Sequence, residues 1–195
     1  MTLETRVSIS EAEQLVKKVF LKNGVREDLA ASVSTALVAA EAEGQVGHGF
    51  SRVKDYIAQV KSKKINVDAI IKIEHPKPTS ISIDADYGFA YPALDQGISE
   101  GALVAKEFGS AVVSIFNSHH CGALSVQVEK IANHGLIGLM MANTPKAIAP
   151  WGGKEPFFGT NPIAFAVPRI AKDPLVIDLS LSKVARGKIM HAKKV

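Results

Sequence analysis

The spacing of the apolar residues changes near residue 70, and this change limits the folds open to the chain. Before it, apolar residues recur at intervals of three and four, which predicts helices. Ser8 and Glu11 have the spacing of a capping box, so we expect the first helix to begin there. A second helix is expected over 27–42 and a third from about Phe50.

Beyond residue 70, short apolar stretches alternate with helical patterns. Residues 80–83 alternate as in a strand, and Pro76 and Pro78 favour a connection before it. Residues 111–116 and 136–141 are typical of buried strands. The other expected elements are strands at 70–73, 163–167 and 175–178, helices from Pro92 to Gly109 and over 124–133, and a basic helix from Lys183. This order predicts a mixed α/β fold, with a helical N-terminal layer plus a mixed sheet with helices.

Composition excludes several classes of protein. Of the 195 residues, 47% are hydrophobic and 22% are charged, which is unlike a disordered chain. No apolar run approaches the roughly 20 residues of a membrane span. The lone Cys121 excludes a disulfide framework and a cysteine-rich zinc site, so we expect a cytoplasmic protein with Cys121 as a buried small residue. The net charge of +4 has no recognition motif beside it, so we expect neither a nucleic-acid nor a membrane partner.

The sequence has neither of the common glycine-rich phosphate loops. The densest glycine run, over 44–49, has the wrong order for a G-x-G-x-x-G fingerprint, and no G-x-x-x-x-G-K-[S/T] motif occurs. A nucleotide cofactor would therefore need a different kind of binding fold.

The first candidate site is the Gly47–Arg52 segment with Tyr56. His48 and Arg52 are four residues apart, so a helix beginning here would place both on one face. A histidine exchanges protons near neutral pH, and an arginine holds a carboxylate with two hydrogen bonds. Together they suit a 2-oxo or 2-hydroxy acid, with Tyr56 as a third contact. A helix start with a surface histidine and arginine is the other interpretation.

The second candidate is the segment from Asn117 to Ala123. It follows an expected strand and precedes a helix, which is where ligands gather in α/β sheets. His119, His120 and Cys121 are adjacent, and adjacent residues rarely converge on one ion, so we expect no metal site.

Two further segments carry small polar side chains. Thr144 and the pair Thr160 and Asn161 lie in a long irregular stretch that suits a cofactor or a polar substrate, or is an ordinary surface loop. Asp178 ends a strand, where it would orient a histidine, bind a ribose hydroxyl or cap a helix.

Taken in order, these motifs resemble the type 2 malate/L-lactate dehydrogenase family. The resemblance covers the chain from about Ser8 to Lys188. It is carried by Glu41-x-x-Gly44, His48-Gly49, Arg52, Tyr56, Ser118-x-His120-x-Gly122-Ala123, Pro150-x-Gly152-Gly153, Gly159-Thr160-Asn161-Pro162, Ile177-Asp178 and Gly187-Lys188. It implies a non-Rossmann NAD(P)-binding fold of the sulfolactate dehydrogenase type. The expected domains are an N-terminal helical part of a substrate and dimerisation domain over 1–75, and a partial NAD(P)-binding α/β domain over 76–195.

The implied activity is hydride transfer between NAD or NADP and C2 of a small 2-hydroxy or 2-oxo acid, or of a cyclic imine carboxylate. In the diketogulonate reductase branch the histidine that matches His48 is the proton donor, whereas in the ureidoglycolate branch the one that matches His120 is the proton acceptor. We keep both as catalytic candidates, with no metal. The substrate-binding candidates are Arg52, Tyr56 and Thr144. The cofactor-binding candidates are Gly122, Thr160, Asn161, Asp178, Leu179 and Ser180.

The chain departs from the family pattern in two ways. Gly47 stands where the family usually has serine, and the sequence stops at Val195, where relatives continue. We therefore expect a C-terminally truncated fold, with a homodimer when the chain is full length. A catalytically inactive remnant that only binds a ligand or a partner is the alternative, and a metal-dependent hydrolase is a third.

Overall fold

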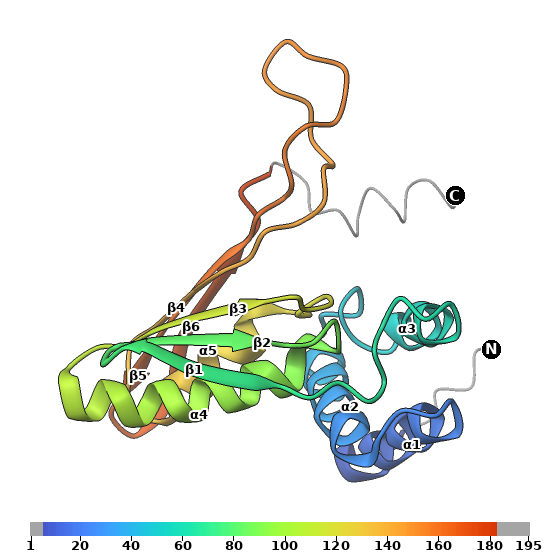
Figure 1. The fold of residues 1–195 in the computed structure, drawn as a ribbon, viewed down its shortest axis with the longest axis horizontal. Coiled ribbons are helices and arrows are strands. Elements are labelled where there is room, and N and C mark those ends of the chain that lie inside the picture. The colour runs from blue at the N-terminus through green and yellow to red at the C-terminus, as the bar shows by residue number, and fades with distance from the viewer. Residues whose placement is uncertain (1–5, 183–195) are drawn as a thin grey trace. The chain divides into compact units, whose positions relative to one another are not determined.

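The computed structural model describes residues 6–182 and divides after Gly122 into two compact units. The first unit contains α1 to α4 and β1 to β3, and the second contains α5 and β4 to β6 (Figure 1). The mixed α/β class predicted from the sequence is confirmed. The domain boundary expected after residue 75 falls inside the first strand, β1 (Lys72–Lys77), and remains a prediction.

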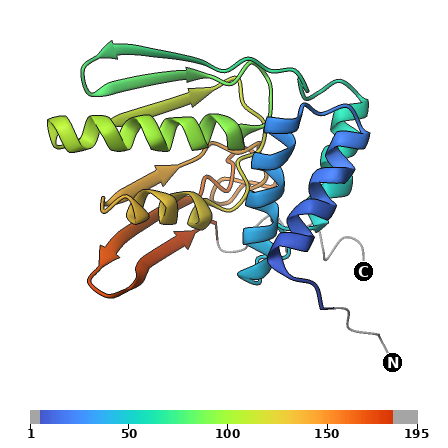
Figure 2. The same ribbon diagram turned by 90° about the horizontal axis from the view of Figure 1, so that it is seen from below.

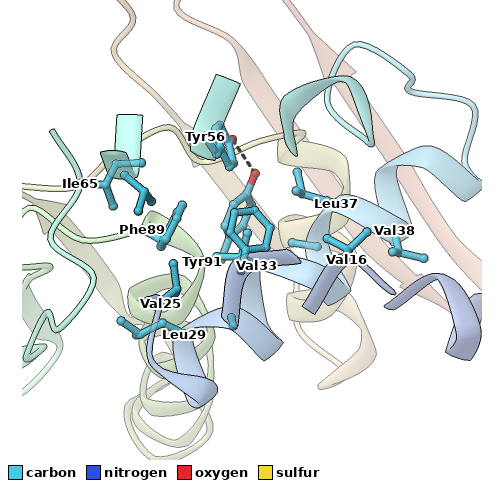
Figure 3. Close-up of a cluster of buried hydrophobic side chains, with 14 of the residues drawn as sticks. Val16, Val25, Leu29, Val33, Leu37, Val38, Tyr56, Ile65, Phe89 and Tyr91 are labelled. Carbon is cyan, nitrogen blue, oxygen red and sulfur yellow. Dashed lines mark hydrogen bonds between the residues drawn. The ribbon is translucent and has the colours of Figure 1, made fainter. Parts of the chain in front are cut away.

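Three helices build the apolar core of the first unit. They are α1 (Ile9–Lys22), α2 (Glu27–Ala42) and α3 (Ser51–Lys61), close to the predicted ranges (Figure 2). The capping box is confirmed, because the Glu11 N–H donates to Ser8 Oγ at 3.2 Å and the Ser8 N–H donates to Glu11 Oε2 at 2.9 Å. Val16, Leu37, Tyr56 and others bury their side chains where these helices meet (Figure 3).

A three-stranded sheet follows, in the order β1-β2-β3. Strand β1 (Lys72–Lys77) pairs antiparallel with β2 (Ser80–Asp84), which pairs parallel with β3 (Val112–Phe116). Pro76 lies inside β1, although the sequence favoured a connection there. The reason is that β1 is an edge strand, where a residue without an N–H removes no ladder bond, and its register shifts between Glu74 and Lys77.

Helix α4 (Ala90–Phe108) covers one face of this sheet (Figure 1). Gly97 allows the close approach, because a Cβ there would stand 2.9 Å from Ile83 Cδ1. The helix ends at Gly109, as predicted, in a left-handed conformation with φ of 87°.

The second unit is one helix on an antiparallel sheet. Helix α5 (Leu124–Asn133) packs on β4 (Gly138–Met141), β5 (Ile163–Arg169) and β6 (Lys172–Leu179), which pair in that order. The basic helix expected from Lys183 lies outside the described residues. None of the described helices combines the length and apolarity needed to cross a bilayer.

The strands expected to be buried have one exposed face each. In β3, Val112 and Phe116 are exposed, and in β4, Leu139 and Met141 are exposed. The sequence-based expectation is therefore wrong for these faces. A continuous apolar run does not reveal whether both faces of a strand are covered, since covering depends on tertiary packing.

Candidate functional site

The turn before α3 is shaped by a carboxylate from α2. Glu41 Oε2 accepts a hydrogen bond from the Phe50 N–H at 2.8 Å. A Cβ on Gly49 would collide with the Glu41 side chain. The glycine after His48 is therefore required by the approach of Glu41, and this contact fixes where the segment carrying His48 enters α3.

His48 and His120 lie next to each other in the first unit. Their rings are stacked, with centroids 5.7 Å apart and an interplanar angle of 7°. His48 precedes α3 and Arg52 lies in its first turn, so the two do not share a helix face as the spacing suggested. Arg52 Nε donates to the Gly47 carbonyl at 2.6 Å, while its terminal amino groups bond no other residue of the described chain.

Tyr56 joins the hydrophobic core to the histidines. Its ring packs among the buried residues of the core, and its hydroxyl lies 3.0 Å from the hydroxyl of Tyr91 (Figure 3). The same hydroxyl lies 2.7 Å from His120 Nδ1. Burial raises the pKa of Tyr56 and of Tyr91 well above the usual value for tyrosine. Both hydroxyls therefore stay protonated and act as hydrogen-bond donors near neutral pH.

His119 points to different partners from its neighbour. Its Nε2 lies 2.8 Å from Gln59 Oε1, and its ring meets the edges of Tyr56 and Phe89. Its Nδ1 is buried and bonds nothing within residues 6–182. Burial, with the positive charges of Lys64 and Arg52, lowers the pKa of His119 to about 4.

The adjacent His119, His120 and Cys121 do not converge on one point. The two histidines bond Gln59 and Tyr56, respectively, and residues 6–182 contain no group of three or more His, Cys, Asp or Glu side chains placed to hold a metal. Cys121 is half-buried, so the expectation of a buried small residue is wrong.

Gly122 has a structural role in this loop. Its N–H donates to His120 Nδ1 at 3.2 Å, and its φ is 72°. A Cβ at this position would stand 2.5 Å from the Tyr91 hydroxyl. These contacts account for the glycine without a cofactor, so its cofactor role remains a prediction.

The second unit brings together four of the predicted polar residues, Thr144, Thr160, Asn161 and Ser180. The Thr144 N–H donates to Asn161 Oδ1 at 3.0 Å, and the Thr144 and Thr160 hydroxyls are 3.2 Å apart. Ser180 Oγ lies 3.4 Å from the Thr160 carbonyl oxygen. Their mutual hydrogen bonds tie the chain after β4 to the chain before β5 and to the end of β6.

Asp178 meets the start of α5, not a histidine. Its Oδ2 accepts from the Ser125 N–H at 2.8 Å, so the carboxylate caps a helix that is distant in sequence. Oδ1 has no hydrogen-bond partner in the described part of the chain, and the residue is exposed. Leu179, the next predicted residue, has an exposed apolar side chain.

Sequence reasoning missed three polar groups that the structure makes prominent. Tyr91 and Gln59 are the partners of Tyr56 and His119. Gln127 is wholly buried on α5, and neither atom of its amide has a partner among residues 6–182. For Gln127 a signal was available, since it stands between Val126 and Val128 in the expected helix.

Comparisons with known proteins agree with the motifs. A (2R)-3-sulfolactate dehydrogenase (NADP⁺) of Chromohalobacter salexigens is 46% identical over 188 residues, covering 96% of this chain and 56% of the relative. A ureidoglycolate dehydrogenase (NAD⁺) of Escherichia coli O157:H7 is 32% identical, covering 96% and 54%. The crystal structure of Δ1-piperideine-2-carboxylate reductase from Pseudomonas syringae matches with a TM-score of 0.93 and 32% identity, covering 98% of this chain and 57% of that one.

The chain thus spans about half the length of the curated relatives it matches. The family match itself extends over residues 7–195, which is nearly the whole sequence. The chain belongs to the malate/L-lactate dehydrogenase family.

Proposed function

We propose that the chain is part of an NAD(P)-dependent oxidoreductase that moves a hydride between the nicotinamide and C2 of a small 2-hydroxy or 2-oxo acid, or of a cyclic imine carboxylate. The observation that carries the proposal is the stacked pair His48 and His120, with the Tyr56 hydroxyl on one ring. The names of the relatives support the same chemistry, because they are dehydrogenases and reductases of acids and cyclic imines.

The substrate end of the reaction belongs to the first unit. Arg52 binds the substrate carboxylate through its terminal amino groups, since its Nε is held by the Gly47 carbonyl. An imidazole, His48 or His120, exchanges the proton at the oxygen or nitrogen on C2. For reduction of a 2-oxo acid, C2 gains a hydride and its oxygen gains that proton. In the same proposal, Tyr56 contacts the substrate beside Arg52.

The polar groups of the second unit fit part of a nicotinamide nucleotide. Asp178 presents an exposed carboxylate whose Oδ1 is unused within the described chain, and such an oxygen suits a ribose hydroxyl. Thr160, Asn161 and Ser180 add neutral hydrogen-bonding groups, and Thr144 lies among them. The cofactor, when bound, supplies or accepts the hydride. A homodimer, a cytoplasmic location and a lack of nucleic-acid or membrane partners belong to the same proposal.

The test is the absorbance of reduced nicotinamide with NADH or NADPH and pyruvate, oxaloacetate or piperideine-2-carboxylate, and with NADP⁺ and 3-sulfolactate in the reverse direction. We expect His48→Ala to lower the rate by roughly 10²-fold or more. Arg52→Ala should lower kcat/KM by about 10–150-fold, the value of a charge-assisted hydrogen bond. The matched controls are His75→Ala and Arg6→Ala, which remove exposed residues of the same types.

A chain that stays folded yet neither binds nor oxidises NAD(P)H with any of these substrates would refute the proposal. Unchanged rates in both His48→Ala and Arg52→Ala would refute the assignment of the site. Equal losses of rate in the control variants would show that any histidine or arginine substitution lowers the activity, and that the loss is not specific to the site.

A further inference from the structure

We propose that Tyr91, Tyr56 and the backbone N–H of Gly122 hold His120 in the tautomer that carries its proton on Nε2. Tyr91 is then a positioning residue, which acts on His120 through the hydroxyl of Tyr56. The consequence for catalysis rests on the proposed function, whereas the tautomer itself does not.

The N–H of Gly122 is the first group that favours the Nε2–H tautomer of His120. A backbone N–H only donates, and this one points at His120 Nδ1 over 3.2 Å. Nδ1 must therefore offer a lone pair, which leaves the proton of the neutral ring on Nε2. The φ of 72° at Gly122 and the close Tyr91 hydroxyl hold the amide in this orientation.

Tyr91 is the second group that favours this tautomer, because it determines which hydroxyl donates in the Tyr91–Tyr56 and Tyr56–His120 hydrogen bonds. Its side chain is buried, and its hydroxyl has one hydrogen-bond partner in the described chain, the Tyr56 hydroxyl at 3.0 Å. A buried O–H without an acceptor is costly, so Tyr91 donates to Tyr56. The Tyr56 proton is then left to donate to His120 Nδ1, 2.7 Å away.

The same chain of donors does not work as a proton wire. Suppose that His120 gave its Nε2 proton to a substrate and took another from Tyr56 through Nδ1. Tyr56 would then take the proton of Tyr91, and Tyr91 would be left as a tyrosinate. Burial raises the pKa of Tyr91 well above its usual value, so a tyrosinate there is disfavoured. Adding a proton to Nδ1 is also opposed, because it would set an N–H against the N–H of Gly122.

In the proposed reaction, His120 is therefore a neutral hydrogen-bond donor to the oxygen or nitrogen at C2. The stacked ring of His48 is left as the group that exchanges the proton. The two histidines, which the sequence alone did not distinguish, therefore have different roles: His120 donates a hydrogen bond and His48 exchanges the proton.

The experiment is a long-range ¹H–¹⁵N NMR measurement of the His120 imidazole in the 195-residue chain at neutral pH, without substrate. We expect at least about a fivefold excess of the Nε2–H form, which is the ratio that one ordinary hydrogen bond gives. In Tyr91→Phe the Tyr56 hydroxyl becomes free to accept from Nδ1–H, whereas the Gly122 N–H still favours Nε2–H, so the ratio should fall by about fivefold, the factor that one hydrogen bond gives, without reversing. Tyr87→Phe is the matched control, since it removes an exposed tyrosine hydroxyl from the same unit and should leave the ratio unchanged.

An Nδ1–H form in the wild-type chain would overturn the proposal without any variant, so a failure of Tyr91→Phe to fold does not protect it. A Tyr91→Phe spectrum with the wild-type ratio would overturn the role of Tyr91. A chain that shows the expected tautomer but no turnover would refute the proposed function and leave this inference standing.

Discussion

His119 makes the stability of the first unit depend on pH between about 6.5 and 4. Its ring is held between the aromatic edges of Tyr56 and Phe89, and Nε2 is engaged by Gln59. Burial is the main reason that its pKa is lowered to about 4, with the charges of Lys64 and Arg52 acting in the same direction. The native structure therefore resists protonation of this ring.

The sign follows from the two pKa values. In the unfolded chain His119 takes up a proton near pH 6.5, and in the native protein it does so only near pH 4. Above pH 6.5 neither state binds the proton, so His119 adds no pH dependence. As the pH falls from 6.5 toward 4, the unfolded state is favoured, and the free energy of unfolding drops. The full difference corresponds to about 3 kcal/mol, and because the ring is only partly buried we expect about 1–2 kcal/mol.

The assay is urea unfolding followed by circular dichroism at pH 7.5, 6.5, 5.5 and 4.5. In His119→Phe the aromatic contacts are kept and the titrating group is lost. The variant should therefore be less stable at pH 7.5, by about 1 kcal/mol for the lost Gln59 bond, yet lose about 1–2 kcal/mol less than the wild type on acidification. His75→Phe replaces a more exposed imidazole and should keep the wild-type fall. Parallel curves for wild type and His119→Phe would refute the reasoning.

Two further changes test local contacts. Gly122→Ala should destabilise the chain by about 2–4 kcal/mol, because it adds a clash with the Tyr91 hydroxyl to a backbone with positive φ. Gly109 also has a positive φ, with open space around it, so Gly109→Ala should cost about 1 kcal/mol, and equal losses in thermal unfolding would contradict the clash. Asp178→Ala removes the acceptor for the Ser125 N–H and should cost about 0.5–2 kcal/mol in chemical unfolding, whereas Asp178→Asn, which keeps an acceptor oxygen, should cost less. Identical unfolding curves for Asp178→Ala and the wild type would rule out the cap.

The helices were predictable because their signals are local. A capping box at Ser8 and Glu11 and a left-handed glycine at 109 satisfy backbone groups within a few residues, so the sequence specifies them directly. The place of Pro76 was not predictable in this way. Whether a proline interrupts a sheet depends on whether its strand has a neighbour on that side, and pairing with a distant strand decides that.

The site was predictable as a set of residues and not as a set of contacts. Short motifs located His48 and His120 in one chain segment each, and the fold placed the two rings in a stack. Tyr91 carried no such signal, because a tyrosine in an apolar helix has the same pattern as a core aromatic residue. Only the position of its hydroxyl beside Tyr56 separates the two roles.

Tyr56 shows why the stability of the first unit and the geometry of its histidines are linked. The Tyr56 side chain belongs to a helix and packs against the core, with its ring centroid 5.8 Å from that of Phe89. This packing fixes the position of the Tyr56 hydroxyl. His48 and His120 stand in irregular segments, and the contacts that orient them include the bond from Glu41 to the turn beside His48 and the bonds of Gly122 and Tyr56 to His120. A cavity made at Phe89 would therefore loosen Tyr56 and, through it, the orientation of His120. Substitutions in the core should thus alter the site even where they touch neither histidine.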